Sequence, residues 1–364
     1  MSKGDKTRYF KTRGAFAASN SSLGFKSYYG QVFDRSRFER YYIIKGGPGT
    51  GKSRFMRDVA QSCEEQGRYV EYYNCSSDPD SLDAIIIDDR IALLDGTAPH
   101  SLDTEIAGAR DEIIDLGVFW NSDLLSSRFD EILQLSEKKK SSYIMGYRYL
   151  SGCADLCEIN DSLISSAIKE KKLLSTVERI VSCIPKGDGF SAIPALFDSI
   201  GMKGRVRFDA YESCAKKLYM VADWYSSAHI FLSAVITYAQ RRDVALRVSY
   251  DPIVPSYPNG VYFCDSGVAL VATDPSDTDK DEGTVINMKR FLDKDIIDSV
   301  KQRYKYNMRL YDAFVSSACD CFAEAGKYHF DLEDIYLACM DFDAKERFTA
   351  SFCERIKRDI GLVK

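Results

Sequence analysis

One stretch constrains the fold of this 364-residue chain more than any other: residues 46–53, which read GGPGTGKS. The residues before it, Tyr41–Ile44, are aromatic and β-branched, as expected for a buried strand. After it, apolar residues recur at helical spacing on one face: Phe55, Met56, Val59, Ala60 and Cys63. A strand, a glycine-rich loop and a helix in this order predict an α/β fold, which we expect to contain a parallel sheet.

The same stretch fits the pattern G-x-x-x-x-G-K-[ST] completely, and each residue type has a chemical reason. Glycines permit positive φ and let backbone N–H groups approach phosphate oxygens. Lys52 would supply a positive charge to the β- and γ-phosphates, and the hydroxyl of Ser53 would bind Mg²⁺. The dipole of the helix that starts here also favours an anion. We therefore predict a site for ATP (or GTP) and Mg²⁺ made by Gly46, Gly47, Pro48, Gly49, Thr50, Gly51, Lys52, Ser53 and Arg54.

Aspartates downstream are candidates for the metal and the chemistry. The apolar run Ile91–Leu94 ends in Asp95, as a Walker B strand does, so Asp95 is our second predicted Mg²⁺ ligand beside Ser53. Asp88 also ends an apolar run and is the alternative; Gly96-Thr97 after Asp95 favours Asp95, because it provides a loop exit. No glutamate follows Asp95, which favours slow turnover.

A further group of aspartates follows the second predicted strand, Tyr69–Tyr73. Among Asp78, Asp80 and Asp83 we name Asp78 as a candidate to position water or an acceptor hydroxyl. An ordinary turn or cap role fits these residues equally well. Two interpretations of His100 also stay open: it is a γ-phosphate sensor, or it is a loop histidine without a role.

The chain contains an internal repeat. Residues 68–97 match residues 245–274, with Val70–Tyr73 on Leu246–Ser249 and Ile91–Leu94 on Val268–Val271. Extended backwards, the match places Tyr41–Ile44 on Lys217–Met220. The second copy has no glycine or lysine at residues 222–229, and Ala272 stands at the position of Asp95. We predict a duplicated fold whose second copy no longer binds a nucleotide.

Long helical patterns without proline follow each predicted sheet, from Leu124 to about Leu174 and from Asp295 to Lys364. We therefore expect a first domain at residues 1–180, with a helical insertion at about 105–180. The second domain is expected at residues 181–364 with a C-terminal helical region.

The composition restricts the partners. A formal net charge of −5 gives no sign of a nucleic-acid-binding surface, so we expect none, and the short basic run at residues 138–140 is interpreted as a solvated helix face. The polar N-terminus lacks the apolar core of a secretory signal, and no apolar run is long enough for a membrane span. Eleven cysteines without a framework spacing fit a reducing compartment. We predict a cytoplasmic protein that does not contact membranes.

The chain resembles a family of uncharacterised bacterial P-loop proteins of about 365 residues. The resemblance is carried by the glycine-rich loop together with CSSDPDSLD (75–83), LLDGTAPH (93–100) and MDFDAKERF (340–348). The resemblance covers essentially the whole chain and implies the fold and nucleotide binding. The expected function is an ATP-binding P-loop NTPase, a hydrolase with slow or partner-stimulated turnover, in which Lys52, Asp95 and Asp78 carry the chemistry. The alternatives are a small-molecule or nucleotide kinase and a regulatory module in which ATP fixes a conformation for an unknown protein partner.

Overall fold

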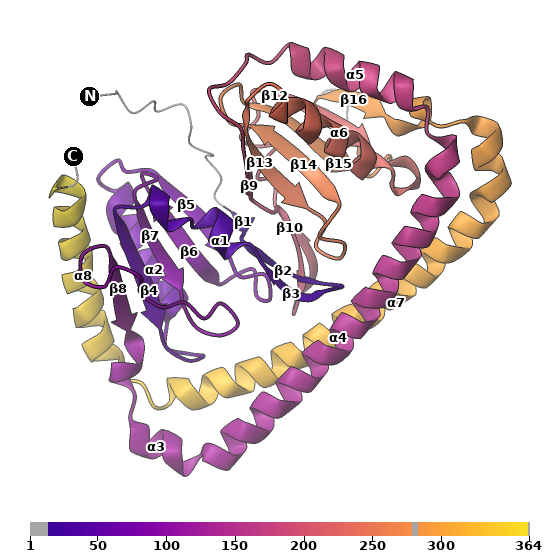
Figure 1. The fold of residues 1–364 in the computed structure, drawn as a ribbon. Helices are drawn as coiled ribbons and strands as arrows, with labels where there is room; N and C mark the ends of the chain where they lie inside the picture. Colours follow the sequence, from indigo (N-terminus) through magenta and orange to yellow (C-terminus); the bar gives the residue numbers. More distant parts are fainter. Residues whose placement is uncertain (1–13, 279–282, 363–364) are drawn as a thin grey trace.

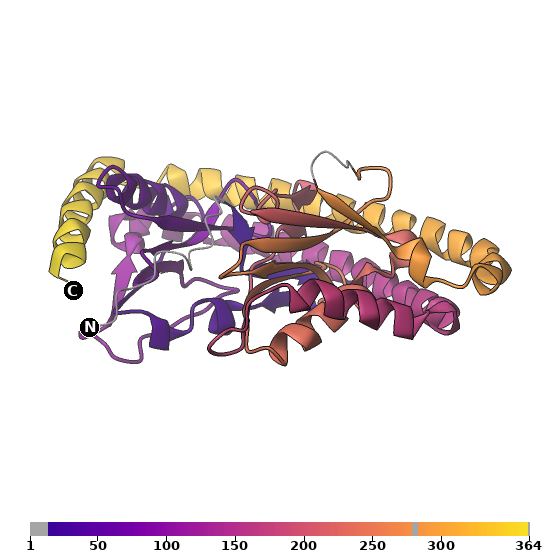
Figure 2. The ribbon, with the colours of Figure 1, turned by 90° about the horizontal axis from the view of Figure 1, so that it is seen from above.

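Two six-stranded sheets and a pair of long helices form the molecule (Figure 1). The structure is a computed structural model that describes residues 14–278 and 283–362. The polar N-terminal segment therefore lies outside the described residues, except for Gly14. Figure 2 shows an elongated molecule, with the first sheet and the C-terminal helix at one end and the second sheet towards the other.

The two sheets have the same strand order. The first is β1-β5-β6-β7-β4-β8, made of β1 (Ala15–Phe16), β4 (Arg40–Lys45), β5 (Val70–Asn74), β6 (Leu82–Ile87), β7 (Ile91–Asp95) and β8 (Asp111–Asp115). The second, in corresponding order, is β9-β13-β14-β15-β12-β16. Its strands are β9 (Ser191–Pro194), β12 (Lys217–Ala222), β13 (Ala245–Tyr250), β14 (Pro258–Phe263), β15 (Val268–Thr273) and β16 (Thr284–Asn287). The α/β architecture and the repeat predicted from the sequence are therefore present.

The predicted parallel sheet is present in part, because each sheet is mixed with mostly parallel pairs. Strand β6 runs antiparallel to both β5 and β7, and β14 runs antiparallel to both β13 and β15. The connection between β6 and β7 consists only of Asp88, Asp89 and Arg90, with φ of 51° and 56° at the two aspartates. A parallel crossover needs a dozen or more residues, so this short turn permits only a hairpin.

The sequence match for β4 and β12 was wrong, by one residue. Tyr41 pairs with Ala92, and Leu218 pairs with Ala269, its counterpart in the second sheet. Tyr41 therefore corresponds to Leu218 and not to Lys217. Because the helices after these strands align at Phe55 and Phe231, the connecting loop of the second copy is one residue shorter.

A small hairpin lies beside each sheet: β2 (Ala18–Ser21) with β3 (Gly24–Ser27), and β10 (Asp198–Gly201) with β11 (Gly204–Arg207). Each hairpin contacts the opposite copy. The Ser22 N–H donates to the Ile253 carbonyl at 3.0 Å, and the Met202 N–H donates to the Ser77 carbonyl at 2.9 Å. One hydrophobic core joins the two copies and includes Phe16, Phe33, Tyr73, Leu196, Phe197 and Tyr211. The halves are therefore not separated by a linker.

Most helices lie on the outer faces of the sheets or along one side of the molecule, whereas the short helix α1 packs into the core that joins the two copies. They are α1 (Tyr29–Val32), α2 (Lys52–Glu64), α3 (Ser122–Ser127), α4 (Phe129–Ile164), α5 (Glu170–Ser182), α6 (Ala228–Gln240), α7 (Lys294–Leu337) and α8 (Phe342–Leu362). Short 3₁₀ turns are η1 (Arg35–Arg37), η2 (Leu116–Phe119), η3 (Ser165–Ala167), η4 (Trp224–Ser226) and η5 (Met288–Phe291).

The long helices α4 and α7 run antiparallel and exchange their following helices between the copies (Figure 1). Helix α4 leaves the first sheet, and α5 after it packs on α6 of the second. Helix α7 returns from the second sheet, and α8 packs on α2, where Ile356 is fully buried among residues of the first sheet. The predicted boundary near residue 180 thus divides the two sheets, while the helices cross it in both directions.

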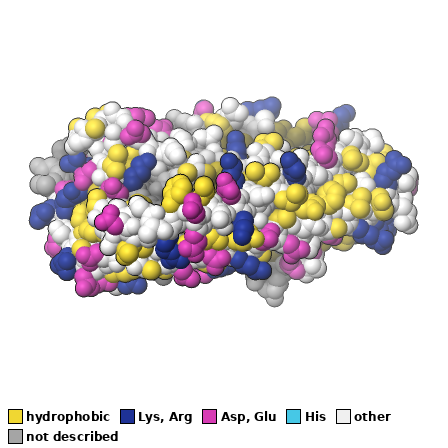
Figure 3. All heavy atoms as spheres, turned by 90° about the horizontal axis from the view of Figure 1, so that it is seen from below, with side chains coloured by type: hydrophobic (Ala, Val, Ile, Leu, Met, Phe, Trp, Pro, Cys, Tyr) yellow, Lys and Arg dark blue, Asp and Glu magenta, His cyan; other side chains and the backbone are white. Residues whose placement is uncertain are grey.

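The surface of the helical side is chemically mixed. Figure 3 shows acidic, basic and hydrophobic side chains interspersed on the face seen from below, without a continuous basic stripe on that face. Among the described residues, no helix combines the length and apolar character needed to cross a membrane.

Candidate functional site

The glycine-rich loop, residues 46–51, joins the buried strand β4 to helix α2. Its backbone has φ of 146° at Gly46, 68° at Gly49 and 74° at Gly51, conformations that side chains other than glycine rarely adopt. Gly51 is the N-cap residue of α2, so the unpaired N–H groups of the first helical turn begin here. The Thr50 hydroxyl donates to the Gly47 carbonyl at 2.9 Å and stabilises the turn. Positive φ at several glycines and a helix N-terminus are features that anion-binding loops share.

Lys52 and Asp95 meet beside this loop. The Lys52 ammonium donates to the carbonyls of Gly46 and Gly47, both at 2.9 Å, and its Nζ lies 3.5 Å from Oδ2 of Asp95. The side chains of Lys52 and Asp95 are each 14% exposed. Burial raises the pKa of Asp95 above its ordinary value, although the Lys52 charge opposes the shift. A buried carboxylate of this kind gains stability from a nearby cation.

Ser53 and Asp95 are held in place by separate loops. The Ser53 hydroxyl oxygen accepts from the Leu82 N–H at 2.9 Å, at the start of β6. Oδ1 of Asp95 accepts from the Thr97 N–H at 2.8 Å and from the Thr97 hydroxyl at 2.5 Å. Arg54, by contrast, is 76% exposed and pairs with Asp58 on the outer side of α2. The predicted loop residues thus gather at one place, with the Arg54 side chain directed away from it.

Asp88, the alternative candidate for the metal ligand, lies at the opposite end of the strands from the glycine-rich loop. It follows β6, which runs antiparallel, and it accepts from Arg68 at 3.2 Å and from the Tyr69 N–H at 3.0 Å. The antiparallel direction of β6 therefore separates Asp88 from the loop. Of the two aspartates, Asp95 is the one that the structure places beside Lys52.

The other predicted aspartates have clear partners. Asp78 accepts from the Ser81 hydroxyl at 2.7 Å and lies 3.3 Å from the ammonium of Lys203, which also pairs with Asp80. Asp83 is buried in β6 and contacts Nε2 of His100 at 3.2 Å. His100 also stacks on Tyr29, with ring centroids 3.9 Å apart. Lys203 comes from the β10–β11 hairpin of the second copy, so both copies contribute to this region.

The C-terminal end of α7 covers the glycine-rich loop. A Cβ added at Gly49 would lie 2.8 Å from the Glu333 carbonyl oxygen, and one added at Gly51 would lie 3.1 Å from the Lys345 ammonium. Burial raises the pKa of the Glu333 carboxyl, and a hydrogen bond from the Gly49 N–H opposes this shift. The Glu333 carboxyl therefore lies close enough to the loop for the Gly49 amide to influence its pKa.

Two further ionisable groups near this region, His329 and Lys139, were not predicted from the sequence. Burial lowers the pKa of His329 to about 4, and the charges of Lys139 and Lys52 act in the same direction. Burial also lowers the pKa of Lys139. The charge of Glu333 opposes this shift, and the charge of Lys52 adds to it. Lys138 and Lys140 are exposed, as expected for a solvated helix face, whereas Lys139 is partly buried. No local motif marks His329 or Lys139, because only the antiparallel return of α7 brings them to the loop.

The corresponding loop of the second copy keeps its turn without glycine. Tyr225 and Ser226 have φ of 60° and 53°, and the Tyr225 ring packs against Tyr304 of α7. The Asp223 carboxylate accepts from the Ala228 N–H at 2.8 Å, so a side chain occupies the start of α6. His229 contacts Asp161 at 3.2 Å and stacks on Tyr257. This loop is filled by its own side chains.

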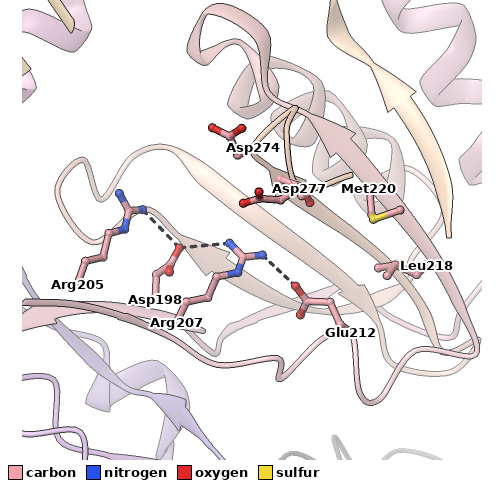
Figure 4. Close-up of a pocket in the computed structure, with 9 residues that line it drawn as sticks. Asp198, Arg205, Arg207, Glu212, Leu218, Met220, Asp274 and Asp277 are labelled. Carbon is pink, nitrogen blue, oxygen red and sulfur yellow. Dashed lines mark hydrogen bonds and ion pairs between the residues drawn. The ribbon is translucent and has the colours of Figure 1, made fainter. Parts of the chain in front are cut away.

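A hollow of about 500 Å³ does lie in the second copy (Figure 4). Its two arginines, Arg205 and Arg207, both point to Asp198, and Arg207 also donates to Glu212 at 2.9 Å. Asp274 and Asp277 add further negative charge to the lining. The basic groups are thus neutralised by carboxylates, which disfavours a polyphosphate there.

Comparisons with protein-family models, with curated proteins and with solved structures returned no match to this chain. Among the described residues, no group of three or more His, Cys, Asp or Glu side chains gathers as a self-sufficient metal site. The functional inference therefore rests on the loop and its surroundings.

Proposed function

We propose that the glycine-rich loop binds the phosphates of ATP or GTP together with Mg²⁺, and that the chain is a P-loop NTPase with slow or partner-stimulated hydrolysis. The observation that carries the proposal is the arrangement of Lys52 between the loop carbonyls and Asp95 at the start of α2. Backbone N–H groups and Lys52 would hold the β- and γ-phosphates. Ser53 and Asp95 offer the hard oxygens that Mg²⁺ prefers.

The position of Glu333 beside Gly49 supports an anion at this loop, because the Gly49 amide lowers the pKa of the Glu333 carboxyl against the effect of burial. Turnover is expected to be slow for two reasons. Gly96 stands where an adjacent water-activating glutamate would follow Asp95. In addition, the end of α7 covers the loop, so hydrolysis would require it to move.

A regulatory module is the second candidate. It is favoured by the filled loop of the second copy and by the long helices that join both copies. In that case ATP would fix one arrangement of α4 and α7 for an unknown protein partner, with little turnover. A kinase, the third reading, would use Asp78 as acceptor base, and the pairing of Asp78 with Lys203 would have to open.

Incubation of the protein with Mg²⁺ and ATP, alone and with a metabolite pool, separates these functions. Release of free phosphate with ATP alone is expected for the NTPase. A phosphorylated metabolite would instead identify a kinase, and tight binding without turnover would identify the regulatory module. Absence of nucleotide binding would contradict the proposal in all its forms.

The variant Lys52→Ala is expected to lose most nucleotide binding, about tenfold or more in Kd, since charge-assisted hydrogen bonds contribute about 1.5–3 kcal/mol. Arg54→Ala is the matched control, because it removes a positive charge from the neighbouring, exposed helix position. Both variants should give the circular dichroism spectrum of the parent. Equal affinity of Lys52→Ala and the parent would mean that the loop is only structural.

A further inference from the structure

A second hollow, of about 650 Å³, lies in the first copy, and one of its lining residues, Trp120, packs against Gly47 of the glycine-rich loop. It forms where η2 and α3 meet the connection from α7 to α8, and its lining includes Phe119, Trp120, Asn121, Leu124, Met340 and Ala344. Its volume falls within the range of small-molecule pockets, ~300–1,000 Å³. Within the lining, aromatic and aliphatic side chains stand beside amide, hydroxyl and carboxylate groups.

Trp120 connects this hollow to the loop. A Cβ added at Gly47 would lie 3.3 Å from Cζ2 of Trp120 and 3.3 Å from Cε1 of Tyr336. The two rings pack together, with centroids 5.4 Å apart. These rings therefore stand between Gly47 and the hollow, and a ligand with its phosphates on the loop would have to pass along them to reach it.

The walls of the hollow are fixed by the backbone. The Asn121 N–H donates to the Cys339 carbonyl at 2.8 Å, and the Asp341 N–H donates to the Phe119 carbonyl at 2.9 Å. These two bonds hold the turn after β8 against the turn between α7 and α8. The shape of the hollow therefore does not depend on a ligand.

The indole N–H of Trp120 is buried and finds no hydrogen-bond acceptor among the residues that the structure describes. Native structures usually pair such a group, because leaving a buried donor unpaired costs free energy. Because protein atoms cover this N–H, an acceptor atom of a ligand would reach it only after the ring moves.

We propose that this hollow binds the nucleoside end of the nucleotide whose phosphates lie on the glycine-rich loop. The inference rests on the proposed function and adds a place for the nucleoside of the ATP or GTP proposed there. The rings of Phe119 and Trp120 supply apolar surface for a base. The carboxylates of Asp123 and Asp341, which also line the hollow, can accept from the amino groups of a base.

The test compares ATP, GTP and inorganic tripolyphosphate, each with Mg²⁺, by equilibrium binding. We expect at least one of the nucleotides to bind the parent at least tenfold more tightly than tripolyphosphate. In Ala344→Trp, which fills the hollow from the start of α8, this preference should fall below threefold while tripolyphosphate binding stays unchanged. Trp120→Phe should reduce the preference in the same way, since it keeps a ring and removes the N–H donor.

The outcomes separate this inference from the proposed function. Equal affinity of the parent for ATP, GTP and tripolyphosphate would overturn the nucleoside pocket and leave phosphate binding by the loop intact. A full nucleotide preference in both variants would overturn it as well. If none of the three ligands binds, the proposed function itself fails.

Discussion

At the scale of single residues, the two copies differ in the loops that come after β4 and β12. In the first copy, glycines adopt positive φ and leave the amides of the loop and of the α2 N-terminus uncovered by their own side chains. In the second, Tyr225 and Ser226 adopt similar φ at a cost of roughly 1–2 kcal/mol each, and the Asp223 carboxylate accepts from the Ala228 N–H. The two copies therefore share a similar backbone turn, but in the second a side chain occupies the N-terminus of the following helix.

A first prediction concerns the metal. Asp95→Asn should reduce Mg²⁺-dependent turnover at least tenfold and affect nucleotide binding much less, because an amide oxygen lacks the charge that a magnesium shell favours. Phosphate binding rests on backbone amides and Lys52, which this change leaves in place. Phosphate release at a series of Mg²⁺ concentrations measures the effect.

Asp88→Asn is the control for this prediction, since Asp88 lies at the end of the strands away from the loop, beside Arg68. It should behave like the parent. Loss of Mg²⁺-dependent turnover in Asp88→Asn, together with normal turnover in Asp95→Asn, would show that the metal ligand has been assigned wrongly. If the parent has no turnover, the same pair is compared by how much Mg²⁺ tightens ATP binding.

At the scale of elements, the sequence predicted the glycine-rich loop with its flanking strand and helix, because strand propensity, glycine spacing and helical periodicity all act locally. It did not predict the direction of β6, since apolar runs such as Ala84–Ile87 look alike in either direction. The brevity of the turn at Asp88–Arg90 was the available signal. Nor could it place Glu333 or Lys345 at the loop, because their approach depends on the antiparallel return of α7 across the whole molecule.

The end of α7, which covers the glycine-rich loop, gives a second prediction. Glu333→Gln should tighten ATP binding about fivefold, since a neutral amide competes less well than a carboxylate for the loop N–H, by on the order of 1 kcal/mol. It also removes a negative charge that would face the phosphates. Asp334→Asn, one residue further along α7 and exposed, makes the same charge change and should leave the affinity unaltered. Unchanged or weaker binding by Glu333→Gln would mean that the Glu333 carboxylate does not compete with the nucleotide.

At the scale of the whole molecule, the two copies are related by an approximate twofold arrangement within one chain. Phe16 and Leu196 occupy equivalent positions, and each donates its N–H to the carbonyl of the other, at 2.7 and 3.0 Å. Glu71 and Arg247 are also equivalent, and they form a buried ion pair at 3.4 Å. In a symmetric dimer of identical chains, the two residues at such equivalent positions would be identical, so they could not carry opposite charges. Opposite charges at these two positions are possible because the copies have diverged.

This ion pair gives a third prediction. Arg247→Met should lower the free energy of unfolding by about 3–5 kcal/mol, because it leaves the Glu71 carboxylate buried without its cation. The double variant Glu71→Leu/Arg247→Met should recover most of that loss. Urea denaturation followed by circular dichroism measures both, with the exposed Arg290→Met as control. A double variant less stable than Arg247→Met alone would contradict the account of a complementary pair.

The central claim is that this duplicated chain binds one nucleotide, at the loop of its first copy. Titration calorimetry with ATP and Mg²⁺ tests it most directly, because it returns the number of sites together with the affinity. The account predicts one site per chain in the parent and loss of that site in Lys52→Ala. Two sites of similar affinity, or a single site that survives in Lys52→Ala, would contradict it.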